Sequence, residues 1–339
     1  MKLIRTQDAV GHVLCHDMTQ IIPGQYKDAR FRKGHVVREE DIPVLLSMGK
    51  ENLYVWEMVP GMVHENDAAE RLCALCENAH MVRSQVKEGK IELSAAMDGL
   101  FRVDTDRLNQ INLLGDIMAA TRHGNRAVHK GDKLCGTRVI PLVIEEEKLR
   151  RAEEIGGGRP LLELLPWKLK TAAVIATGSE VAKGLIEDAF TPVVARKLAE
   201  YGIEVTRTSR PGDDMARITG DILAAKEAGA DLIVCTGGMS VDPDDRTPGA
   251  IKASGASIVT YGAPVLPGAM FLLGYFADGT PVMGLPGCVM YAGRTIFDLI
   301  LPRAAAGVPV TREEIAALGE GGLCLGCETC TFPNCGFGV

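Results

Sequence analysis

The feature that most constrains the fold is an apolar strand within Asp231–Ile251 that runs directly into the glycine pair Gly237 and Gly238. Glycine has no Cβ, so backbone N–H groups in such a turn can come close to an anion. The hydroxyls of Thr236 and Ser240 offer further donors to the same anion. The segment therefore predicts a phosphate-binding turn at the end of a strand in an α/β sheet.

Acidic residues follow the glycine pair, namely Asp242, Asp244 and Asp245. These carboxylates would repel a bare phosphate, which favours a bridging divalent cation such as Mg²⁺. Pro248 suits the first turn of a helix after the acids. The alternative interpretation is a solvated acidic turn, because short glycine motifs are common in proteins without a phosphate site.

Two other segments repeat the design of an apolar strand followed by a glycine turn. Ala172–Val181 carries Gly178 after its strand, and Thr280–Pro302 carries Gly287 between a strand and an amphipathic helix. In an open α/β sheet, turns at the carboxyl ends of strands gather at one edge, where ligands bind. The three turns together predict one crevice.

These residues resemble the molybdopterin-binding domain shared by the molybdopterin adenylyltransferase and the molybdenum insertase of cofactor biosynthesis. The resemblance covers about residues 170–308 and implies an α/β fold, in which a mostly parallel sheet forms a three-layer domain. Four motifs stand in the order of the insertase: Thr177-Gly-Ser-Glu180, Gly237-Gly-Met-Ser-Val241 with Asp245, Pro267-Gly-Ala-Met270 and Gly284-Leu-Pro-Gly-Cys-Val289.

The resemblance implies molybdopterin, or its adenylylated form, as the ligand, with Mg²⁺ at Asp245. It also implies ATP and molybdate as candidate co-substrates, a molybdenum enzyme apoprotein as a candidate partner and a homo-oligomer. Asp245 and Glu180 are the candidate catalytic residues. The candidate cofactor-binding residues are Thr177, Gly178, Ser179, Gly237, Gly238, Met239, Ser240, Asp245, Pro267, Gly268, Leu285, Pro286 and Gly287.

Departures from the insertase pattern leave three functions open. Ser179 stands where the insertase has an Asp, Ala269-Met270 replaces Lys-Pro, and Cys288-Val289 replaces Asn-Pro. The first two changes remove a candidate metal ligand and a phosphate counter-charge. Asp245-Arg-Thr-Pro248 is similar to the adenylyltransferase, and Pro243-Asp-Asp-Arg-Thr247 to the competence/damage-inducible family. The chain is thus an adenylyl- or molybdenumtransferase-like enzyme, a non-catalytic carrier or sensor, or a nucleotide hydrolase.

Composition sets the general class of protein. The chain has 339 residues, 46% of them hydrophobic, and a formal net charge of -7, which argues against a nucleic-acid or anionic-membrane binder. No run approaches the roughly 18 apolar residues of a membrane span, and Met1–Asp8 lacks a signal-peptide core. We therefore expect a cytoplasmic protein, in which clustered cysteines more often bind metal than form disulfides.

Glycine-rich Gly156–Pro160 predicts a break between two domains. We expect a β-rich α+β domain over residues 1–155, a molybdopterin-binding domain over 168–308 and a cysteine-rich tail over 309–339. Within the first domain, Phe31–Lys50 is similar to an insertase segment. Ser94–Leu100 is similar to the insertase Ser-Ala-Met-Asp-Gly motif, which makes Asp98 a candidate functional residue; the alternative for Asp98 is a turn between strands.

The tail carries Cys324, Cys327, Cys330 and Cys335, in the spacing Cys-x2-Cys-x2-Cys-x4-Cys. Four thiolates so close together can surround one soft metal, either an iron–sulfur cluster or Zn²⁺. A metal-free, redox-active or disordered tail is the alternative. By contrast, Cys73-Ala-Leu-Cys76 lies in a segment of helical periodicity, where cysteines are usually core residues.

Overall fold

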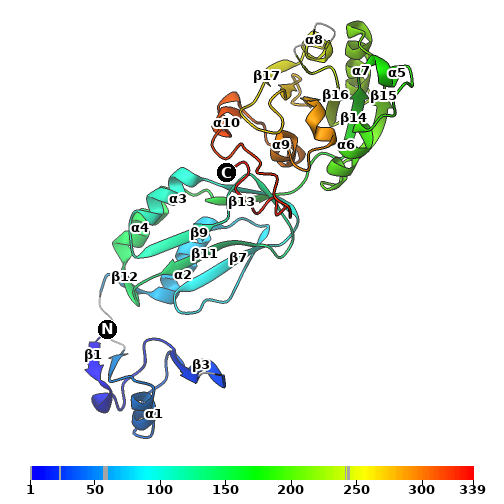
Figure 1. Ribbon diagram of the computed structural model, residues 1–339. Helices are drawn as coiled ribbons and strands as arrows, with labels where there is room; N and C mark the ends of the chain where they lie inside the picture. The colour runs from blue at the N-terminus through cyan, green and yellow to red at the C-terminus, as the bar shows by residue number, and fades with distance from the viewer. Residues whose placement is uncertain (1, 23, 56–59, 241, 243–244) are drawn as a thin grey trace. The chain divides into compact units, whose positions relative to one another are not determined.

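The computed structural model describes residues 2–22, 24–55, 60–240, 242 and 245–339 (Figure 1). Of the acidic turn that follows the glycine pair, Val241, Pro243 and Asp244 lie outside the described residues. The chain divides into two compact units. Unit 1 contains residues 1–96, 103–122 and 131–163, and unit 2 contains residues 97–102, 123–130 and 164–339.

Unit 1 is rich in antiparallel strands, as expected for the amino-terminal region. In its described residues, β6, β7, β11 and β9 form a sheet in that order, and β1–β4, β2–β3 and β5–β12 form pairs. The elements are β1 (Lys2–Arg5), η1 (Thr6–Asp8), β2 (Met18–Ile22), β3 (Tyr26–Phe31), α1 (Asp41–Ser47), β4 (Asn52–Val55), β5 (Met62–His64), α2 (Glu65–Cys76), β6 (Met81–Arg83), β7 (Lys90–Ala95), α3 (Thr105–Asn112), β9 (Ile117–Thr121), β11 (Lys133–Val139), β12 (Val143–Glu145) and α4 (Glu146–Gly156).

The helical prediction for the segment around Cys73 and Cys76 is confirmed, because both residues lie in α2 and are fully buried. Burial raises the pKa of the Cys73 thiol to about 12. Cys76 also has a raised pKa, caused by a hydrogen bond with Cys135 and by burial. Both cysteines therefore stay protonated at neutral pH and belong to the core.

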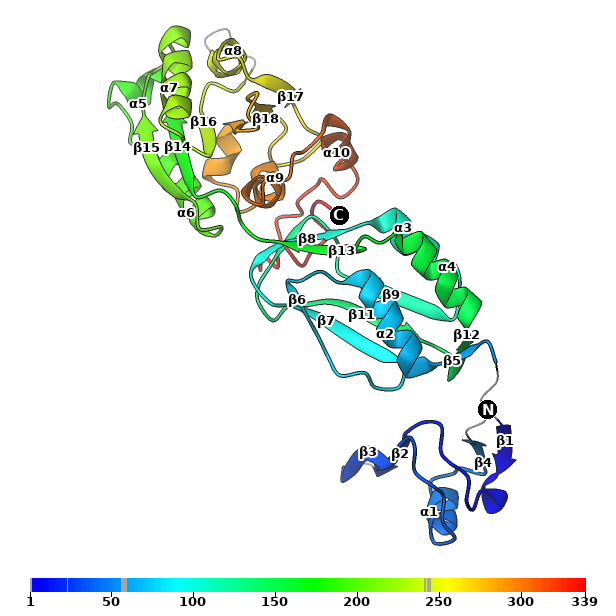
Figure 2. The ribbon, with the colours of Figure 1, turned by 180° about the vertical axis from the view of Figure 1, so that it is seen from behind.

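Unit 2 is built around a mixed six-stranded sheet in the order β15-β14-β16-β19-β18-β17 (Figures 1 and 2). The pairs β15–β14, β14–β16 and β16–β19 are parallel, and the other two pairs are antiparallel. The main elements are β14 (Thr171–Ala176), α5 (Ser179–Ala182), α6 (Phe190–Ala199), β15 (Glu204–Ser209), α7 (Met215–Glu227), β16 (Leu232–Thr236), α8 (Thr247–Ala253), β17 (Ser257–Tyr261), β18 (Leu272–Tyr275), β19 (Pro281–Leu285), η2 (Gly287–Met290), α9 (Ile296–Ala305) and α10 (Arg312–Ala317).

A smaller sheet has the order β10-β8-β13, with β8 at Gly99–Val103, β10 at Arg126–Val128 and β13 at Leu162–Leu165. Strands β8 and β13 contain two of the points at which the chain passes from one unit to the other.

Alternate side chains of the central strands face opposite layers, which gives the predicted three-layer α/β domain. Ala172 and Val174 of β14 pack with residues of α6 and α9, whereas Ala173 and Ile175 pack with residues of α7 and α8. Because both faces are covered, strands β14 and β16 are buried almost throughout. Each buried Val, Leu or Ile contributes about 1.5–3 kcal/mol relative to an exposed one.

A buried ion pair joins the two helices of one layer. Lys197 Nζ of α6 lies 2.6 Å from Asp298 Oδ1 of α9, and the two side chains are 8% and 3% exposed. Lys197 Nζ also donates to the carbonyl of Gly293 at 2.9 Å. Asp298 additionally accepts from Arg294 at 2.9 Å and completes the capping box of Thr295 at the start of α9. The pair therefore fixes α6 against the segment that carries the Gly287 turn into α9.

We predict that Lys197→Met lowers the free energy of unfolding of unit 2 by about 3 kcal/mol, because it leaves a buried carboxylate short of one partner. Urea unfolding followed by Trp167 fluorescence, in a Trp56→Phe background, measures the change. Arg196→Met on the exposed side of α6 is the control and should stay within about 0.5 kcal/mol. Equal effects of the two substitutions would show that the ion pair contributes little.

Candidate functional site at the carboxyl edge of the six-stranded sheet

The strand register places the predicted binding loops along one edge of the sheet. Ala176, the last residue of β14, is paired with Thr236 at the end of β16, and Thr236 is paired with Leu285 at the end of β19. Leu272 at the start of β18 is paired with Gly284 and with Tyr261 at the end of β17. The turns after β14, β16 and β19 therefore share this edge with the β17–β18 connection, which carries Pro267 and Gly268.

Close packing of backbone explains the two glycines after β16. Gly237 and Gly238 have φ angles of +85° and +55°, in the left-handed region. A Cβ on Gly237 would lie 2.6 Å from the Thr177 carbonyl oxygen, and one on Gly238 would lie 2.8 Å from Thr247 Oγ1. Both positions therefore require glycine for the fold itself, before any ligand is considered.

Buried hydroxyl groups link these loops. Thr177 Oγ1 lies 3.0 Å from the carbonyl oxygen of Thr236 and 3.0 Å from Thr247 Oγ1. The backbone N–H of Thr247 donates to the Gly238 carbonyl at 3.3 Å. Thr177 therefore connects the ends of β14 and β16 to the start of α8.

Thr236 has a hydroxyl that makes no hydrogen bond with the described residues. Its side chain is fully buried, and Thr236 Oγ1 has no hydrogen-bond partner among the described residues. Buried hydroxyls nearly always have a partner, which is often an ordered water or a ligand. This atom stands at the last residue of β16, immediately before the glycine pair.

Two carboxylates are held against the loops by backbone amides. Asp245 Oδ2 accepts from the Ser240 N–H at 2.7 Å, and Asp213 Oδ2 accepts from the Ser179 N–H at 2.7 Å. Asp213 comes from the β15–α7 connection, so the structure brings an acid beside Ser179, the position at which the insertase has its own Asp. A phosphate on either amide would have to displace a carboxylate.

Tyr261 is a residue of this edge that sequence reasoning did not select. Its hydroxyl donates to the Met239 carbonyl at 2.8 Å and lies 3.3 Å from the Ser240 carbonyl. Burial raises the pKa of Tyr261, and the charge of Asp245 raises it further. Tyr261 therefore stays protonated near neutral pH and lies close to Asp245. No motif signals this residue, because its position follows from the antiparallel register of β17.

The remaining predicted residues divide by exposure. Met239, Gly268, Leu285 and Pro286 are buried, and Met239 lies so close to Gly284 that a Cβ there would be 2.6 Å from its sulfur. Gly268 is also closely packed, because a Cβ there would lie 2.6 Å from Cγ2 of the Ile296 side chain. Thr177 is buried as well. The exposed members of the set are Glu180, Ser240 and Gly287. The partly exposed members are Gly178, Ser179, Asp245 and Pro267.

The tail cysteines are partly covered by the core of unit 2. Cys324 and Cys335 pack against it, whereas Cys327 and Cys330 are exposed. Across the described residues, the structure holds no group of three or more His, Cys, Asp or Glu side chains that could bind a metal ion. Asp98, the candidate in the first domain, accepts from the Lys130 N–H at 2.7 Å and lies 3.5 Å from His129 Nδ1, so its contacts are with a segment far along the chain.

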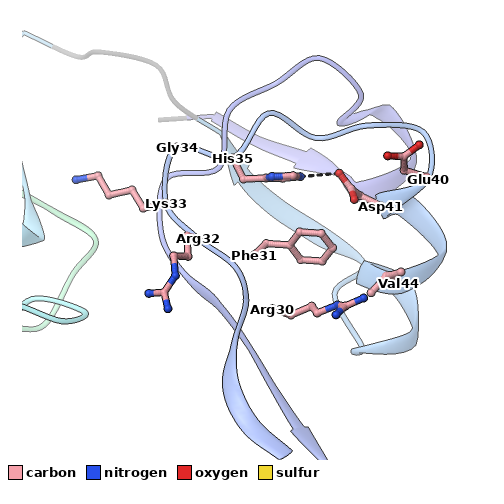
Figure 3. Close-up of a pocket in the computed structure, with 9 residues that line it drawn as sticks. All are labelled: Arg30, Phe31, Arg32, Lys33, Gly34, His35, Glu40, Asp41 and Val44. Carbon is pink, nitrogen blue, oxygen red and sulfur yellow. Dashed lines mark hydrogen bonds and ion pairs between the residues drawn. The ribbon is translucent and has the colours of Figure 1, made fainter.

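A separate hollow lies in unit 1, and Figure 3 shows the side chains that line it. Its volume is about 670 Å³. His35 Nε2 lies 2.6 Å from Asp41 Oδ2, at the start of α1. Burial acts to raise the pKa of Asp41, but hydrogen bonds from His35 and the Arg38 N–H hold it below its ordinary value. Asp41 is therefore ionised in the folded protein.

Ligands of open α/β domains bind at the carboxyl edge of the sheet, which is the edge that carries these loops. Comparison with known proteins shows which family this domain is similar to. Residues 173–306 match the family described as "Probable molybdopterin binding domain". Residues 3–57 match a domain of unknown function. None of the described helices has the length and apolar character needed to span a membrane.

Curated relatives match a short part of the chain. A "Putative competence-damage inducible protein" of Levilactobacillus brevis is 40% identical over 76 residues, which is 22% of this chain and 18% of that protein. A "CinA-like protein" of Mycobacterium tuberculosis is 37% identical over 76 residues, with the same coverage. The chain thus spans less than a fifth of the length of these relatives.

Solved structures match at low identity. The molybdopterin biosynthesis enzyme MoaB of Thermus thermophilus is 20% identical, with a TM-score of 0.32, and the match covers 40% of this chain and 91% of that one. The protein CinA of Thermoplasma acidophilum is 20% identical, with a TM-score of 0.35, over 40% of this chain and 98% of that one.

We predict that Thr177→Val costs about 1–2 kcal/mol of the free energy of unfolding of unit 2, because it removes the buried hydroxyl that Thr247 contacts. Trp167 fluorescence during urea unfolding, again with Trp56→Phe, measures the loss. Thr206→Val on the exposed edge strand β15 is the matched control and should cost nothing measurable. A Thr177 variant as stable as this control would show that the hydroxyl does not hold the loops together.

Proposed function

We propose that the domain over residues 168–308 binds molybdopterin or its adenylylated form at the carboxyl edge of the six-stranded sheet, in molybdenum cofactor biosynthesis or insertion. The observation that carries this proposal is the family match of residues 173–306. The unpartnered Thr236 hydroxyl supports it, because the fold leaves a buried donor at the point where the loops meet.

The described residues suggest how a phosphorylated ligand would be held. Ser240 is exposed and offers a hydroxyl, and the glycine pair lets the ligand approach the backbone. Asp245 and Asp213 bring negative charge to the loops, so a phosphate here is best accommodated through a divalent cation. We propose Mg²⁺ in this role, with Asp245 as its ligand.

A transferase and a carrier differ in the charges they need. Ser179 lacks a carboxylate, but Asp213 places one against its amide at 2.7 Å. This replacement supports retention of a second acidic group at the site, and therefore a transferase in which Asp245 and Glu180 are catalytic. The missing lysine at Ala269 supports a carrier or sensor that delivers the cofactor to a molybdenum enzyme apoprotein. ATP, molybdate and a homo-oligomeric state belong to the transferase hypothesis.

A nucleotide hydrolase is the second candidate function. The curated relatives, named as competence-damage inducible or CinA-like, favour it through 34–40% identity over 76 residues. One assay separates the functions. Purified protein is incubated with molybdopterin, ATP, Mg²⁺ and molybdate, and separately with pyridine nucleotides. AMP transfer or molybdate-dependent AMP release indicates a transferase, pyridine-nucleotide hydrolysis indicates the hydrolase, and binding alone indicates a carrier.

We predict that Asp245→Asn weakens molybdopterin binding at saturating Mg²⁺ by about tenfold or more, because a charged ligand of the cation is lost. Asparagine keeps an oxygen for the Ser240 N–H, so the loop itself should persist. Asp245→Ala should lose the same magnesium-dependent part of the affinity. Titration calorimetry with and without Mg²⁺ measures both.

Asp278→Asn is the control, because Asp278 lies in the β18–β19 connection at the opposite edge of the sheet, and its substitution should leave the affinity unchanged. Binding that is indifferent to Mg²⁺ and to Asp245 would overturn the metal bridge and leave a site that grips phosphate through backbone donors. If neither form of molybdopterin binds the intact protein, the proposed function itself is wrong.

We also propose that Cys324, Cys327, Cys330 and Cys335 bind a soft metal, either as an iron–sulfur cluster or as Zn²⁺. Their spacing carries this proposal, and the exposure of Cys327 and Cys330 leaves these thiols accessible to an incoming metal. Folding of the tail around the ion would bring the four sulfurs together.

We predict that anaerobically purified protein contains metal and that Cys327→Ser releases most of it, because a four-thiolate site loses a ligand. Elemental analysis measures the content, and absorption near roughly 400 nm identifies iron–sulfur. Cys288→Ser, outside the tail, should retain the metal. Truncation before the tail is a poorer test, since Phe337 is only 5% exposed in the core. Metal content independent of the tail cysteines would exclude the site.

A further inference from the structure

A cavity in unit 2 lies apart from the loops that carry Gly178, Gly238 and Gly287. It has a volume of about 210 Å³ and lies between the segment that leads into β10, helices α9 and α10, and the carboxyl-terminal segment. Its lining combines apolar side chains with buried guanidinium groups. The residues relevant to binding are Asn125, Arg126, Leu299, Arg303, Glu314 and Leu318.

The hydrogen-bond donors of Arg303 are only partly satisfied within this cavity. It is 6% exposed, and its Nη2 donates to both carboxylate oxygens of Glu314 at 2.8 Å and to the Pro309 carbonyl at 2.7 Å. Its Nε is buried and has no partner among the described residues. One donor of this guanidinium therefore stays unused.

Arg126 is the less compensated of the two. It is 6% exposed, its Nη2 donates to the Phe337 carbonyl, and its Nη1 is buried without a partner in the described part of the chain. No ion pair joins Arg126 to a described carboxylate. Burial lowers its pKa, although the nearby Cys335 acts in the opposite direction. A buried cation without a counter-charge is destabilising, so a bound anion would be favoured here.

The charges around the cavity leave it positive. Glu314 is its only acidic lining residue among the described residues, against Arg126 and Arg303. Burial acts to raise the pKa of Glu314, but the hydrogen bonds from Arg303 hold it below its ordinary value, and the charge of Arg102 contributes in the same direction. Glu314 is therefore ionised and already committed to Arg303, which leaves the charge of Arg126 for another anion.

We propose that this cavity binds a small tetrahedral oxyanion between Arg126 and Arg303. Buried donors without partners are satisfied by ligands or water, and guanidinium groups match the geometry of oxyanions. A volume of about 210 Å³ admits such an ion with a few waters, since each water takes up about 30 Å³. Phosphate, sulfate and molybdate share this chemistry.

An oxyanion bound in this cavity would also stabilise the carboxyl-terminal segment. Arg126 contacts the Phe337 carbonyl and lies 5.5 Å from the Phe332 ring centre. An anion that fixes Arg126 therefore orders the segment between the last tail cysteine and the core.

Calorimetric titration of the full chain with phosphate, sulfate and molybdate, at constant ionic strength, tests the site. We expect saturable binding of one ion per chain. The ion that binds most tightly of the three identifies the oxyanion for which the cavity is suited. Arg126→Gln should weaken it by about tenfold or more, because a charge-assisted contact is lost. Glu314→Gln should strengthen it, because a competing carboxylate is removed.

Arg312→Gln is the matched control, since it removes the same charge from the exposed surface of α10. Ala317→Phe fills the cavity from an exposed helix position without a change of charge, and should abolish binding even if Arg126→Gln folds poorly; circular dichroism verifies each fold. Three outcomes would overturn the proposal. They are the absence of saturable oxyanion binding, an equal loss of affinity in Arg312→Gln, and oxyanion binding that persists in folded Ala317→Phe.

Discussion

The unit that carries the candidate site depends on the close approach of backbone at the ends of β14 and β16. A side chain on Gly237 would collide with the Thr177 carbonyl at 2.6 Å, and one on Gly238 with Thr247 Oγ1 at 2.8 Å. This contact brings the start of α8 against the sheet and leaves the loops little freedom. The tight turn that the fold requires is also the geometry that would let an anion reach the backbone, so the same residues serve the fold and the proposed binding.

Electrostatics at this edge refine the simplest interpretation of a glycine loop. A phosphate nest needs open N–H groups, yet Ser240 and Ser179 give theirs to Asp245 and Asp213. Carboxylates therefore already occupy these two amides. An anionic ligand would gain more binding free energy from a bridging cation than from displacing the carboxylates. The exposed Ser240 hydroxyl and the buried Thr236 hydroxyl are two donors that these carboxylates do not occupy.

The sequence predicted the α/β domain well, because its signals are local. Apolar runs that end in glycine turns located β14, β16 and β19, and parallel sheets place such turns at one edge. Asp213 and Tyr261 could not be given roles, because their contacts depend on strand order and on register, which no local pattern encodes. Arg126 is harder still, since its partner Phe337 lies 211 residues away along the chain.

The tail illustrates how long-range contacts change the meaning of a local motif. Considered alone, the four closely spaced cysteines predict a metal site. In the structure, however, their segment contacts the connection that carries Pro267, beside the candidate binding site. Leu323 bridges Leu266, and the Cys324 N–H donates to the Leu266 carbonyl at 2.8 Å, one residue before Pro267. Further along, the Phe332 ring lies 4.9 Å from the Arg294 guanidinium. Any rearrangement of the tail around a metal must act on Leu266 and Arg294, and through them on the Pro267 connection and the start of α9. The proposed metal at the cysteines and the proposed ligand at the sheet edge are therefore linked through the contacts of Leu266 and Arg294.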